Sequence, residues 1–346
     1  MTRYITLTVF CLLTAQVTAQ VLSKEEAIQI VMENNFDIRV ANNDLEIAEN
    51  NTGILNSGYL PTLNGTAGIT YNSDNLNAQF QDGRTTELTG AQSDSRTAGL
   101  SLNYVLFNGF NRKYNMELNR ENLNLSQLNA RAILETVMLD LFTAYYDVAR
   151  NEQTIKTLRE TLDISKDRLL RSEYGYDYGR NSKLDVTNAQ VDVNTDSINY
   201  LNATQSLATA QRNLNLILGQ ESLTMMEVDT TLNLKGLKDY EAFKEAVLTQ
   251  NTNLLSAQSG VRQSQLSVKT NQSRYFPTLS LSGNYNYRLG NNNQASFLAS
   301  STSTGLSGSV NLNWDLFDGG TTSVTTENAK INQMSNRYCL SKPSSR

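Results

Sequence analysis

The stretch Tyr59-Leu60-Pro61-Thr62-Leu63 returns 216 positions later as Tyr275-Phe276-Pro277-Thr278-Leu279. The same shift aligns residues 31–63 with residues 247–279 without a gap, and a shift of 210 aligns Leu102–Gly109 with Leu312–Gly319. Two of the three prolines fall on equivalent positions. Coincidence is a poor explanation of this agreement, and we infer an internal duplication of a long unit.

Each copy is predicted to begin with a helix that leads into a strand hairpin. In the first copy this helix covers residues 23–57 and opens with Ser23 as its N-cap and Glu26 three positions on. Apolar residues then recur every seven positions, at Val31, Ile38 and Leu45. Pro61 is expected to stop the helix, because the residue before a proline is pushed out of the α region.

After each proline the apolar period changes from seven to two, which indicates β-strands. The predicted strands cover about 63–72 and 98–106 in the first copy, with a polar loop to about residue 97, and about 279–289 and 306–316 in the second. A length of about ten residues suits a tilted transmembrane strand with one face toward lipid and the other toward a wet lumen. The alternative is a soluble sandwich with one wet face.

Long heptad helices flank the hairpins. A seven-residue series runs from about Asn111 to Ser172, at Leu134, Leu141, Val148, Ile155, Leu162 and Leu169. A second series runs from Leu184 to Leu218, at Val186, Val193, Tyr200, Leu207 and Leu214. Such repeats predict supercoiled helices, and the first arm would span roughly 90 Å. Two glycines and an Asn-Ser pair between the arms predict the turn of a helical hairpin.

Composition excludes several classes of function. The 346 residues carry 29 basic and 34 acidic side chains, which is the wrong balance for a protein that grips nucleic acid. The chain has no histidine, the commonest general base and metal ligand. We therefore predict no catalytic residue, no cofactor and no metal site. Tyr145 and Tyr146 are interpreted as packing or lumen-lining residues rather than a ligand cage.

Residues 1–19 have the pattern of an export signal. Arg3 precedes an apolar run from Ile5 to Leu13, and Val17-Thr18-Ala19 supplies small residues at a cleavage site. The mature chain is expected to begin at Gln20. No later stretch has the run of about 18 apolar residues that a membrane-spanning helix needs, so any membrane crossing is expected to use β-strands.

Four strands cannot close on themselves. In lipid each unpaired backbone group costs several kcal/mol, and the smallest transmembrane barrels have about eight strands. A dimer would have a filled interior, whereas a trimer would enclose an aqueous lumen. The small polar residues of the predicted inner face favour the hollow tube, but this arithmetic does not fix the number of copies.

The chain resembles the TolC-like outer membrane factors, the exit ducts of drug-efflux pumps and type I secretion systems in Gram-negative bacteria. The resemblance covers residue 22 to about residue 335. It includes the duplicated Tyr-(Leu/Phe)-Pro-Thr-Leu joints and the Leu-Phe-(Asn/Asp)-Gly corners at Leu106–Gly109 and Leu316–Gly319. The remaining matching motifs are Leu22–Ile28 followed by Glu33-Asn34-Asn35, Gly179…Asp185-Val186…Ala189, and Leu214-Asn215-Leu216-Ile217-Leu218-Gly219.

The resemblance implies an α+β membrane protein, a homotrimer whose twelve-stranded β-barrel continues into a periplasmic barrel of coiled-coil helices. Such a duct is passive, lies in outer-membrane lipid and docks through a periplasmic adaptor onto an inner-membrane pump that delivers small molecules or proteins. The adaptor-contacting tip maps to Gly179, Arg180, Asn181, Ser182, Leu184, Asp185 and Val186. The helix-to-strand joints map to Tyr59, Pro61, Tyr275 and Pro277, and the strand-to-helix corners to Phe107, Gly109, Phe317 and Gly319.

The predicted segments follow from the duplication and the resemblance. They are a signal peptide (1–19), a periplasmic helix (20–58), a transmembrane hairpin (59–108), a long coiled-coil hairpin (109–219), an equatorial segment with the helix of the second copy (220–274), a second transmembrane hairpin (275–318) and the start of a truncated helix (319–346). By the shift of 210, Arg346 corresponds to Thr136, so counterparts of residues 137–218 are missing. The last helix is expected to begin near Thr321 and to lose its helical structure from Cys339 onward. We hypothesise a truncated or frameshifted gene product, in which the entrance-constricting residues of the family cannot be mapped.

Three other interpretations compete with the duct. A periplasmic adaptor or other coiled-coil binding module shares the helical hairpin but surrounds it with compact soluble β-domains. An enzyme on a helical scaffold would need a catalytic set that the sequence lacks. A non-functional fragment of a duct is the third.

Overall fold

The computed structural model describes residues 21–220, 227–231 and 239–341. The predicted signal segment 1–19 and the final residues 342–346 lie outside this part of the chain. The chain divides into two compact units, residues 1–43 with 130–243 and residues 44–129 with 244–346. The division falls within three helices, namely α2 (Phe36–Asn51), α3 (Asn111–Asp177) and α5 (Tyr240–Gln250).

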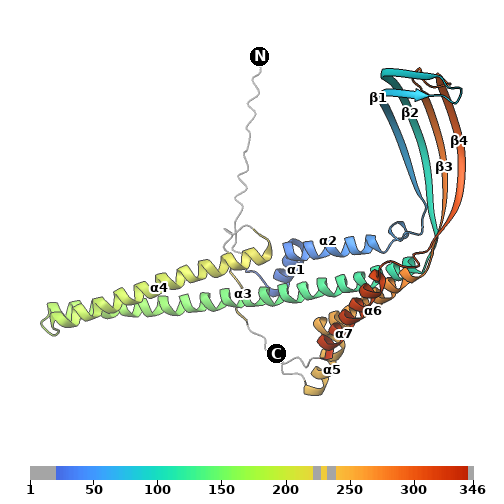
Figure 1. Ribbon diagram of the computed structural model, residues 1–346. Coiled ribbons are helices and arrows are strands. Elements are labelled where there is room, and N and C mark those ends of the chain that lie inside the picture. The colour runs from blue at the N-terminus through green and yellow to red at the C-terminus, as the bar shows by residue number, and fades with distance from the viewer. Residues whose placement is uncertain (1–20, 221–226, 232–238, 342–346) are drawn as a thin grey trace, which may run out of the picture. The chain divides into compact units, whose positions relative to one another are not determined.

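The first unit is built on a hairpin of two long helices. The later part of α3 and α4 (Lys183–Leu218) run side by side in opposite directions (Figure 1). The whole of α3 has 67 residues, which corresponds to a length of about 100 Å. The arms predicted at 111–172 and 184–218 agree with these helices to within a few residues.

The core of the first unit follows the heptad pattern. Leu141, Val148 and Leu162 of the α3 series are buried, and Leu214 of the α4 series is buried as well. Ala27 and Val31 of α1 (Lys24–Asn34) complete this core. A seven-residue spacing keeps one side of each helix against its neighbour. The predicted apolar seam is therefore confirmed.

The first predicted helix is interrupted, so a single helix over 23–57 is wrong. The break lies at Asn35, which is buried. Its Oδ1 accepts hydrogen bonds from the N–H groups of Asp37 and Ile38 at 2.9 and 3.1 Å, and its Nδ2 donates to the carbonyl oxygen of Ile217 at 2.8 Å. Asn251, its counterpart by the shift of 216, caps α6 (Thr252–Gln272) in the same way. An N-cap of this kind starts a new helix at the break without disturbing the apolar spacing.

The transition into the first strand also differs from the prediction. α2 ends at Asn51 and is followed by a short 3-10 turn, η1 (Ile54–Asn56). Pro61 therefore does not stop a helix but directly precedes β1 (Thr62–Gln79), where its fixed φ suits an extended chain. The second copy repeats this order, with η2 (Ser273–Tyr275) and Pro277 before β3 (Thr278–Asn291).

Tyr145 connects α3 to the segment before α1. Its side chain is 1% exposed, and its hydroxyl donates to the carbonyl oxygen of Leu22 at 2.7 Å and accepts from the N–H of Asp229 at 3.0 Å. Leu22 and Val228 also form a parallel β-bridge. A buried hydroxyl needs such partners. The interpretation of Tyr145 as a packing residue is confirmed.

Glu152, on the same helix, has a carboxylate oxygen, Oε1, that is buried without a hydrogen-bond partner among the described residues. Burial raises the pKa of Glu152 above its ordinary value, a backbone hydrogen bond from Val228 opposes this, and the Glu227 carboxylate adds to the rise. A carboxyl whose pKa is raised by folding destabilises the folded chain at neutral pH, and this cost is lost as the pH falls through the raised pKa.

We expect Glu152→Gln to raise the midpoint of thermal unfolding by a few degrees at about pH 7, because the neutral amide removes the buried charge. The gain should shrink near pH 4, where Glu152 itself takes up a proton. Circular dichroism melting curves at both pH values measure this difference. Glu160→Gln, at an exposed position of the same helix, is the matched control. A gain of equal size at both pH values would contradict the electrostatic cause.

The second unit contains a four-stranded antiparallel sheet in the order β1-β2-β3-β4. The remaining strands are β2 (Thr85–Asn108) and β4 (Ser300–Asn313). β2 pairs with β3 from Asp94↔Asn291 to Asn108↔Thr278, which joins the two hairpins into one sheet (Figure 1). The strands have 18, 24, 14 and 14 residues, so the predicted length of about ten is wrong for all four.

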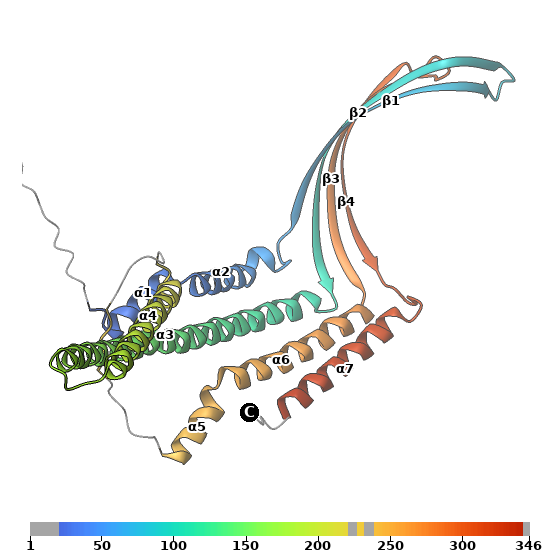
Figure 2. The ribbon, with the colours of Figure 1, turned by 90° about the vertical axis from the view of Figure 1, so that its left-hand side faces the viewer.

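The first hairpin extends further than the second (Figure 2). Residues 85–93 of β2 lie beyond its last pair with β3 and pair only with β1. The polar loop predicted up to residue 97 is therefore mostly strand, and the turn is confined to residues 80–84. Residues 85–93 carry no strand signal in the sequence, because alternation of apolar and polar residues appears only where one face meets an apolar environment.

The other helices of the second unit are α6 and α7 (Thr321–Ser341), which lie side by side (Figure 2). α7 begins where predicted but continues through Cys339, so the predicted loss of helix from that residue is wrong.

The start of α3 is bonded to α6, because Glu121 Oε1 accepts hydrogen bonds from Ser259 Oγ at 2.6 Å and from Arg262 Nε at 2.9 Å. Burial alone raises the pKa of Glu121, but these hydrogen bonds outweigh it and leave the pKa below its ordinary value. Among the described helices, none is both long and apolar enough to cross a membrane.

Candidate functional site

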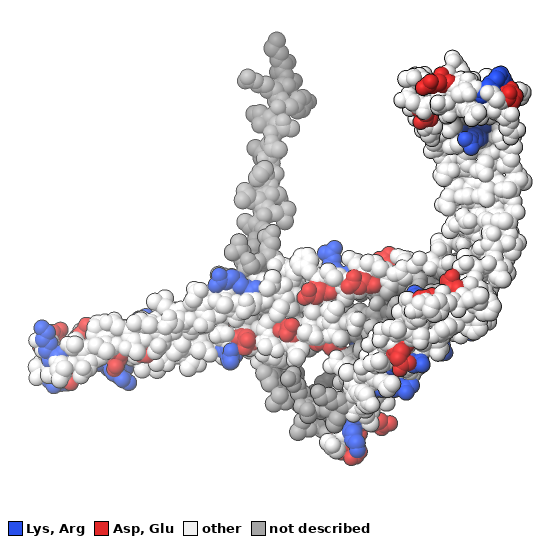
Figure 3. All heavy atoms as spheres, in the orientation of Figure 1, with Lys and Arg blue, Asp and Glu red and all other residues white. Residues whose placement is uncertain are grey.

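The sheet has one apolar and one polar face, as the alternation predicted. On the apolar face many side chains are open in the single chain, and Ile69 and Leu306 are 78% and 84% exposed. On the polar face the hydroxyls of Ser282 and Ser309 lie 2.7 Å apart, and Asn311 donates to both. Charged side chains are absent from the middle of the described strands on the face seen in Figure 3. Such a sheet can meet lipid on one side and water on the other.

The first strand-to-helix corner is tightly packed. Gly109 has a φ of +65°, and a Cβ at this position would lie 2.2 Å from the carbonyl oxygen of Ser273. Phe107 packs edge-to-face on Phe110, with ring centres 5.3 Å apart. Glycine is therefore needed at 109 both for the left-handed backbone and for the close approach of the helix-to-strand joint of the second copy.

Arg112 links three elements at this corner. Its guanidinium donates to the carbonyl oxygens of Gly58 and Leu106 at 3.3 and 2.9 Å, and it lies 4.7 Å from the ring centre of Tyr59. One side chain thus connects the joint before β1, the end of β2 and the first turn of α3. The sequence alone does not reveal the role of Arg112, because its counterpart in the second copy is Thr322 and the duplication does not mark it.

The second corner has the same turn in open surroundings. Gly319 has a φ of +70°, yet no described atom lies within 4 Å of the position of a Cβ. Phe317 is 88% exposed. Asp318 accepts hydrogen bonds from the N–H groups of Gly320 and Thr322 at 3.0 and 2.8 Å, which caps α7. The corners therefore share a backbone shape and differ in what packs against them.

The turn between α3 and α4 is closed by two backbone motifs. The N–H of Arg180 donates to Gly175 O at 2.7 Å and that of Gly179 to Tyr176 O at 2.9 Å, which forms a Schellman ending with Gly179 at a φ of +74°. Ser182 and Asp185 then form a capping box at the start of α4. The Ser182 N–H and hydroxyl both donate to the Asp185 carboxylate at 2.8 Å and hold its pKa below the ordinary value. Ser182 and Asp185 therefore have a structural role in the turn.

The outer surface of this turn carries three exposed tyrosines besides the predicted tip residues. Five of the seven predicted tip residues are exposed, namely Gly179, Arg180, Ser182, Leu184 and Asp185. The other two, Asn181 and Val186, are half-buried. Tyr174, Tyr176 and Tyr178 precede them and are 57%, 47% and 81% exposed. The spacing of these tyrosines could have predicted their exposure, since residues two positions apart cannot all lie on one buried face of a helix.

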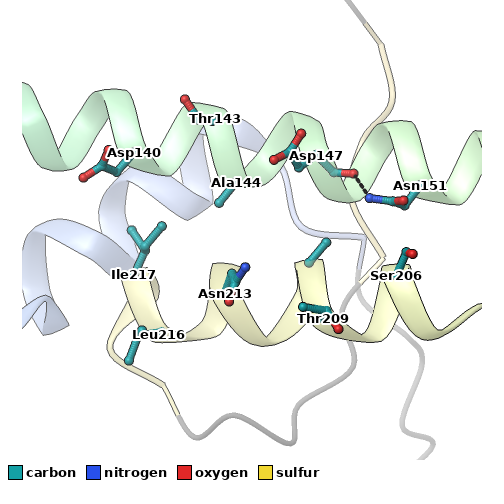
Figure 4. A pocket seen from close by; sticks show the side chains of 11 residues that line it. Asp140, Thr143, Ala144, Asp147, Asn151, Ser206, Thr209, Asn213, Leu216 and Ile217 are labelled. Carbon is teal, nitrogen blue, oxygen red and sulfur yellow. Dashed lines mark hydrogen bonds between the residues drawn. The ribbon is translucent and has the colours of Figure 1, made fainter. Parts of the chain in front are cut away.

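An open groove of about 500 Å³ runs between α3 and α4 (Figure 4). Asp140 and Asp147 line it from α3, and Thr209 and Asn213 line it from α4. Asp147 pairs with Arg150 at 2.9 Å. Leu216 and Ile217 add apolar surface to its wall, and the groove lacks the enclosure of a small-molecule pocket. Within the described residues, no group of three or more His, Cys, Asp or Glu side chains could hold a metal ion.

Comparison with known proteins connects the sheet and the helical hairpin with one family. The family model described as outer membrane efflux protein matches residues 27–220 and 245–341. The outer membrane protein TolC of Vibrio cholerae serotype O1 is 25% identical over 279 residues, which cover 80% of this chain and 60% of the relative. The outer membrane efflux protein BepC of Brucella suis biovar 1 is 22% identical over 307 residues, covering 86% of this chain and 61% of the relative. The crystal structure of the CmeC outer membrane channel of Campylobacter jejuni has a similar fold, with a TM-score of 0.74 and 16% identity over 92% of this chain and 66% of that one.

The sheet and the helical hairpin together give the chain the α+β fold of solved outer-membrane channel proteins. The chain belongs to the outer membrane efflux protein family, as the motifs at its joints and corners predicted. It is located in the outer membrane with a large periplasmic portion, and its family consists of channels rather than enzymes. The chain spans about 60% of the length of the curated relatives that it matches.

Proposed function

We propose that the chain forms the passive exit duct of a tripartite efflux or type I secretion system. In this proposal three copies combine their sheets into one twelve-stranded barrel in the outer membrane, and their α3–α4 hairpins contribute to the wall of a periplasmic tunnel. The observation that supports it is the sheet itself, which has an apolar face and, among the described residues, an unpaired edge on each outer strand, β1 and β4. In lipid such edges require partner strands, and a barrel of about eight strands would be filled by its own side chains.

The turn between α3 and α4 is the surface that we assign to a periplasmic adaptor. Arg180, Tyr178 and Leu184 are exposed there on a backbone that the Schellman ending and the capping box hold in place. Aromatic and arginine side chains on a rigid turn are typical of protein interfaces. The cargo would be the small molecules or proteins that an inner-membrane pump delivers, because a wide polar lumen selects little.

The proposal is tested by the size of the particle in detergent. Outer membranes that contain the chain are solubilised and analysed by size-exclusion chromatography with light scattering, and unheated and heated samples are compared by gel electrophoresis. We expect three chains per particle and a heat-sensitive trimer band. A single chain released from membranes by carbonate without detergent would overturn the duct and would support a soluble coiled-coil adaptor instead.

A further inference from the structure

The body of the sheet contains few charged side chains. We define this body as the residues over which β2, β3 and β4 are all paired, together with the part of β1 beside them, namely 62–71, 94–108, 278–291 and 300–313. The charged residues within these ranges are Asp94, Arg96 and Arg288. The face on which each of them lies decides whether its charge is directed toward the apolar or the polar side of the sheet.

Arg288 lies on the polar face, three residues before the end of β3. β3 is an inner strand between β2 and β4 (Figure 2), and the residues opposite Arg288 are Thr97 and Ser303. Residues directly opposite each other in neighbouring strands share a face of the sheet. Ser282, an even number of positions earlier on β3, has its hydroxyl on the same face. The side chain of Arg288 is exposed there.

The other two charged residues lie on the apolar face and offset each other. Arg96 is opposite Leu289, and its Nε lies 3.7 Å from Asp94 Oδ2. Asn291 also donates hydrogen bonds to the two carboxylate oxygens of Asp94, at 2.9 and 3.1 Å. The guanidinium of Arg288, in contrast, has neither an ion pair nor a hydrogen bond among the described residues. The polar face of the body therefore carries one positive charge that no acidic group offsets.

Two acidic residues that follow the body of the sheet are too far along the strands to offset this charge. Asp74 is six positions along β1 from Gly68, which lies at the level of Arg288 through Thr97, and this corresponds to about 20 Å. Asp315 follows β4 at the opposite end of the sheet, twelve positions from Ser303, which corresponds to about 40 Å. Both separations exceed the Debye length of about 10 Å at 0.1 M salt.

Resting on the proposed duct, we propose that Arg288 makes the outer section of the lumen favour anions over cations. Three copies would place three guanidinium groups at one level of the barrel. Twelve strands about 4.8 Å apart and tilted by about 40° enclose a backbone circle of about 12 Å radius. Because the guanidinium extends from that circle into the lumen, the axis lies within about one Debye length of each charge at 0.1 M salt.

This preference concerns small anions and the anionic groups of larger solutes. A ring of charged side chains sets the ion selectivity of a pore by raising the concentration of the oppositely charged ion beside it. At the distances and the salt concentration above, three positive charges change the ratio of anions to cations by at least about threefold. A lumen that passes many kinds of cargo can still discriminate in this way, because the effect depends on charge and not on shape.

The reversal potential of the purified full chain in planar lipid bilayers tests this inference, with a KCl gradient near about 0.1 M. We expect Arg288→Gln to lower the ratio of chloride to potassium permeability by at least about threefold. Arg288→Glu should lower this ratio further, whereas Arg288→Lys keeps the charge and should keep the ratio. The differences should nearly vanish at about 1 M salt, where the Debye length is about 3 Å.

Arg96→Gln is the matched control, because it removes the same charge from the apolar face. It should leave the permeability ratio unchanged, and an equal change in both variants would show that the net charge of the protein, not the position of Arg288, sets the ratio. If the parent protein is trimeric in detergent but Arg288→Gln leaves the ratio unchanged, the inference is wrong and the proposed duct stands. A trimer that carries no current also overturns the inference. If the parent protein is monomeric in detergent, the proposed duct fails, and this inference fails with it.

Discussion

Replacing Gly109 by alanine is expected to lower the stability of the second unit by about 3 kcal/mol. A left-handed backbone costs an L-residue about 1–2 kcal/mol, and a methyl group forced into packed surroundings adds about 1–3 kcal/mol. Both costs apply at Gly109, whose φ is +65° and where a Cβ would lie 2.2 Å from Ser273 O. The obstacle is a backbone carbonyl rather than the flexible end of a side chain, so the joint itself would have to move.

The loss is measured by urea unfolding of the detergent-solubilised protein, followed through the fluorescence of Trp314. This residue is the only tryptophan of the chain, and its Nε1 donates to Tyr275 O in the joint. Gly90→Ala is the matched control, because Gly90 has a φ of +68° and no described atom within 4 Å of a Cβ. The control should lose only the backbone cost of about 1–2 kcal/mol. Equal losses in the two variants would contradict the close packing of the corner.

Leu141→Ala is expected to destabilise the first unit by about 3–4 kcal/mol. Leu141 is 1% exposed and belongs to a core that includes Val137, Tyr145 and Leu214. Removing most of a buried leucine side chain forfeits its transfer free energy and leaves a cavity, since long helices joined along their seam relax only in part.

Helical circular dichroism during heating measures the effect of Leu141→Ala, and hydrogen exchange of α3 and α4 assigns it to the first unit. Leu139→Ala, two residues away, is the matched control, because Leu139 is 67% exposed in the chain. Its effect on the folded chain should stay within about 0.5 kcal/mol. A control that costs as much as Leu141→Ala would show that the heptad seam is not the core of this unit.

The sequence predicted the number and order of the strands in the second unit, but not their lengths or the pairing of β2 with β3. The proline joints and the change of period located four strands, but the strands are longer than the apolar alternation. Residues 85–93 have no apolar face to reveal them, because they extend beyond the third strand and pair only with β1. The pairing of β2 with β3 joins residues 170 to 197 positions apart, from Asn108↔Thr278 to Asp94↔Asn291, and no local pattern records it.

For the candidate surfaces too, the sequence predicted the location but not the contacts. The turn from α3 to α4 was located correctly because glycine and an Asn-Ser pair favour a Schellman ending and an N-cap. The exposed tyrosines of this turn and the role of Arg112 were not predicted, since the exposure of a side chain and its hydrogen bonds to distant carbonyl groups depend on neighbours from other segments.

The sequence by itself determined the kinds of elements, their duplication and the family. These properties are local, because a spacing of seven or two sets which side of a helix or strand is apolar, and proline and glycine set the backbone where elements meet. Only the tertiary structure decided where α1 ends, which strands are neighbours and which of the two equivalent glycines is enclosed. Gly109 and Gly319 have the same turn, yet Ser273 packs against the first alone. Such differences arise from contacts between distant segments, and equivalent residues acquire different energies when those contacts differ.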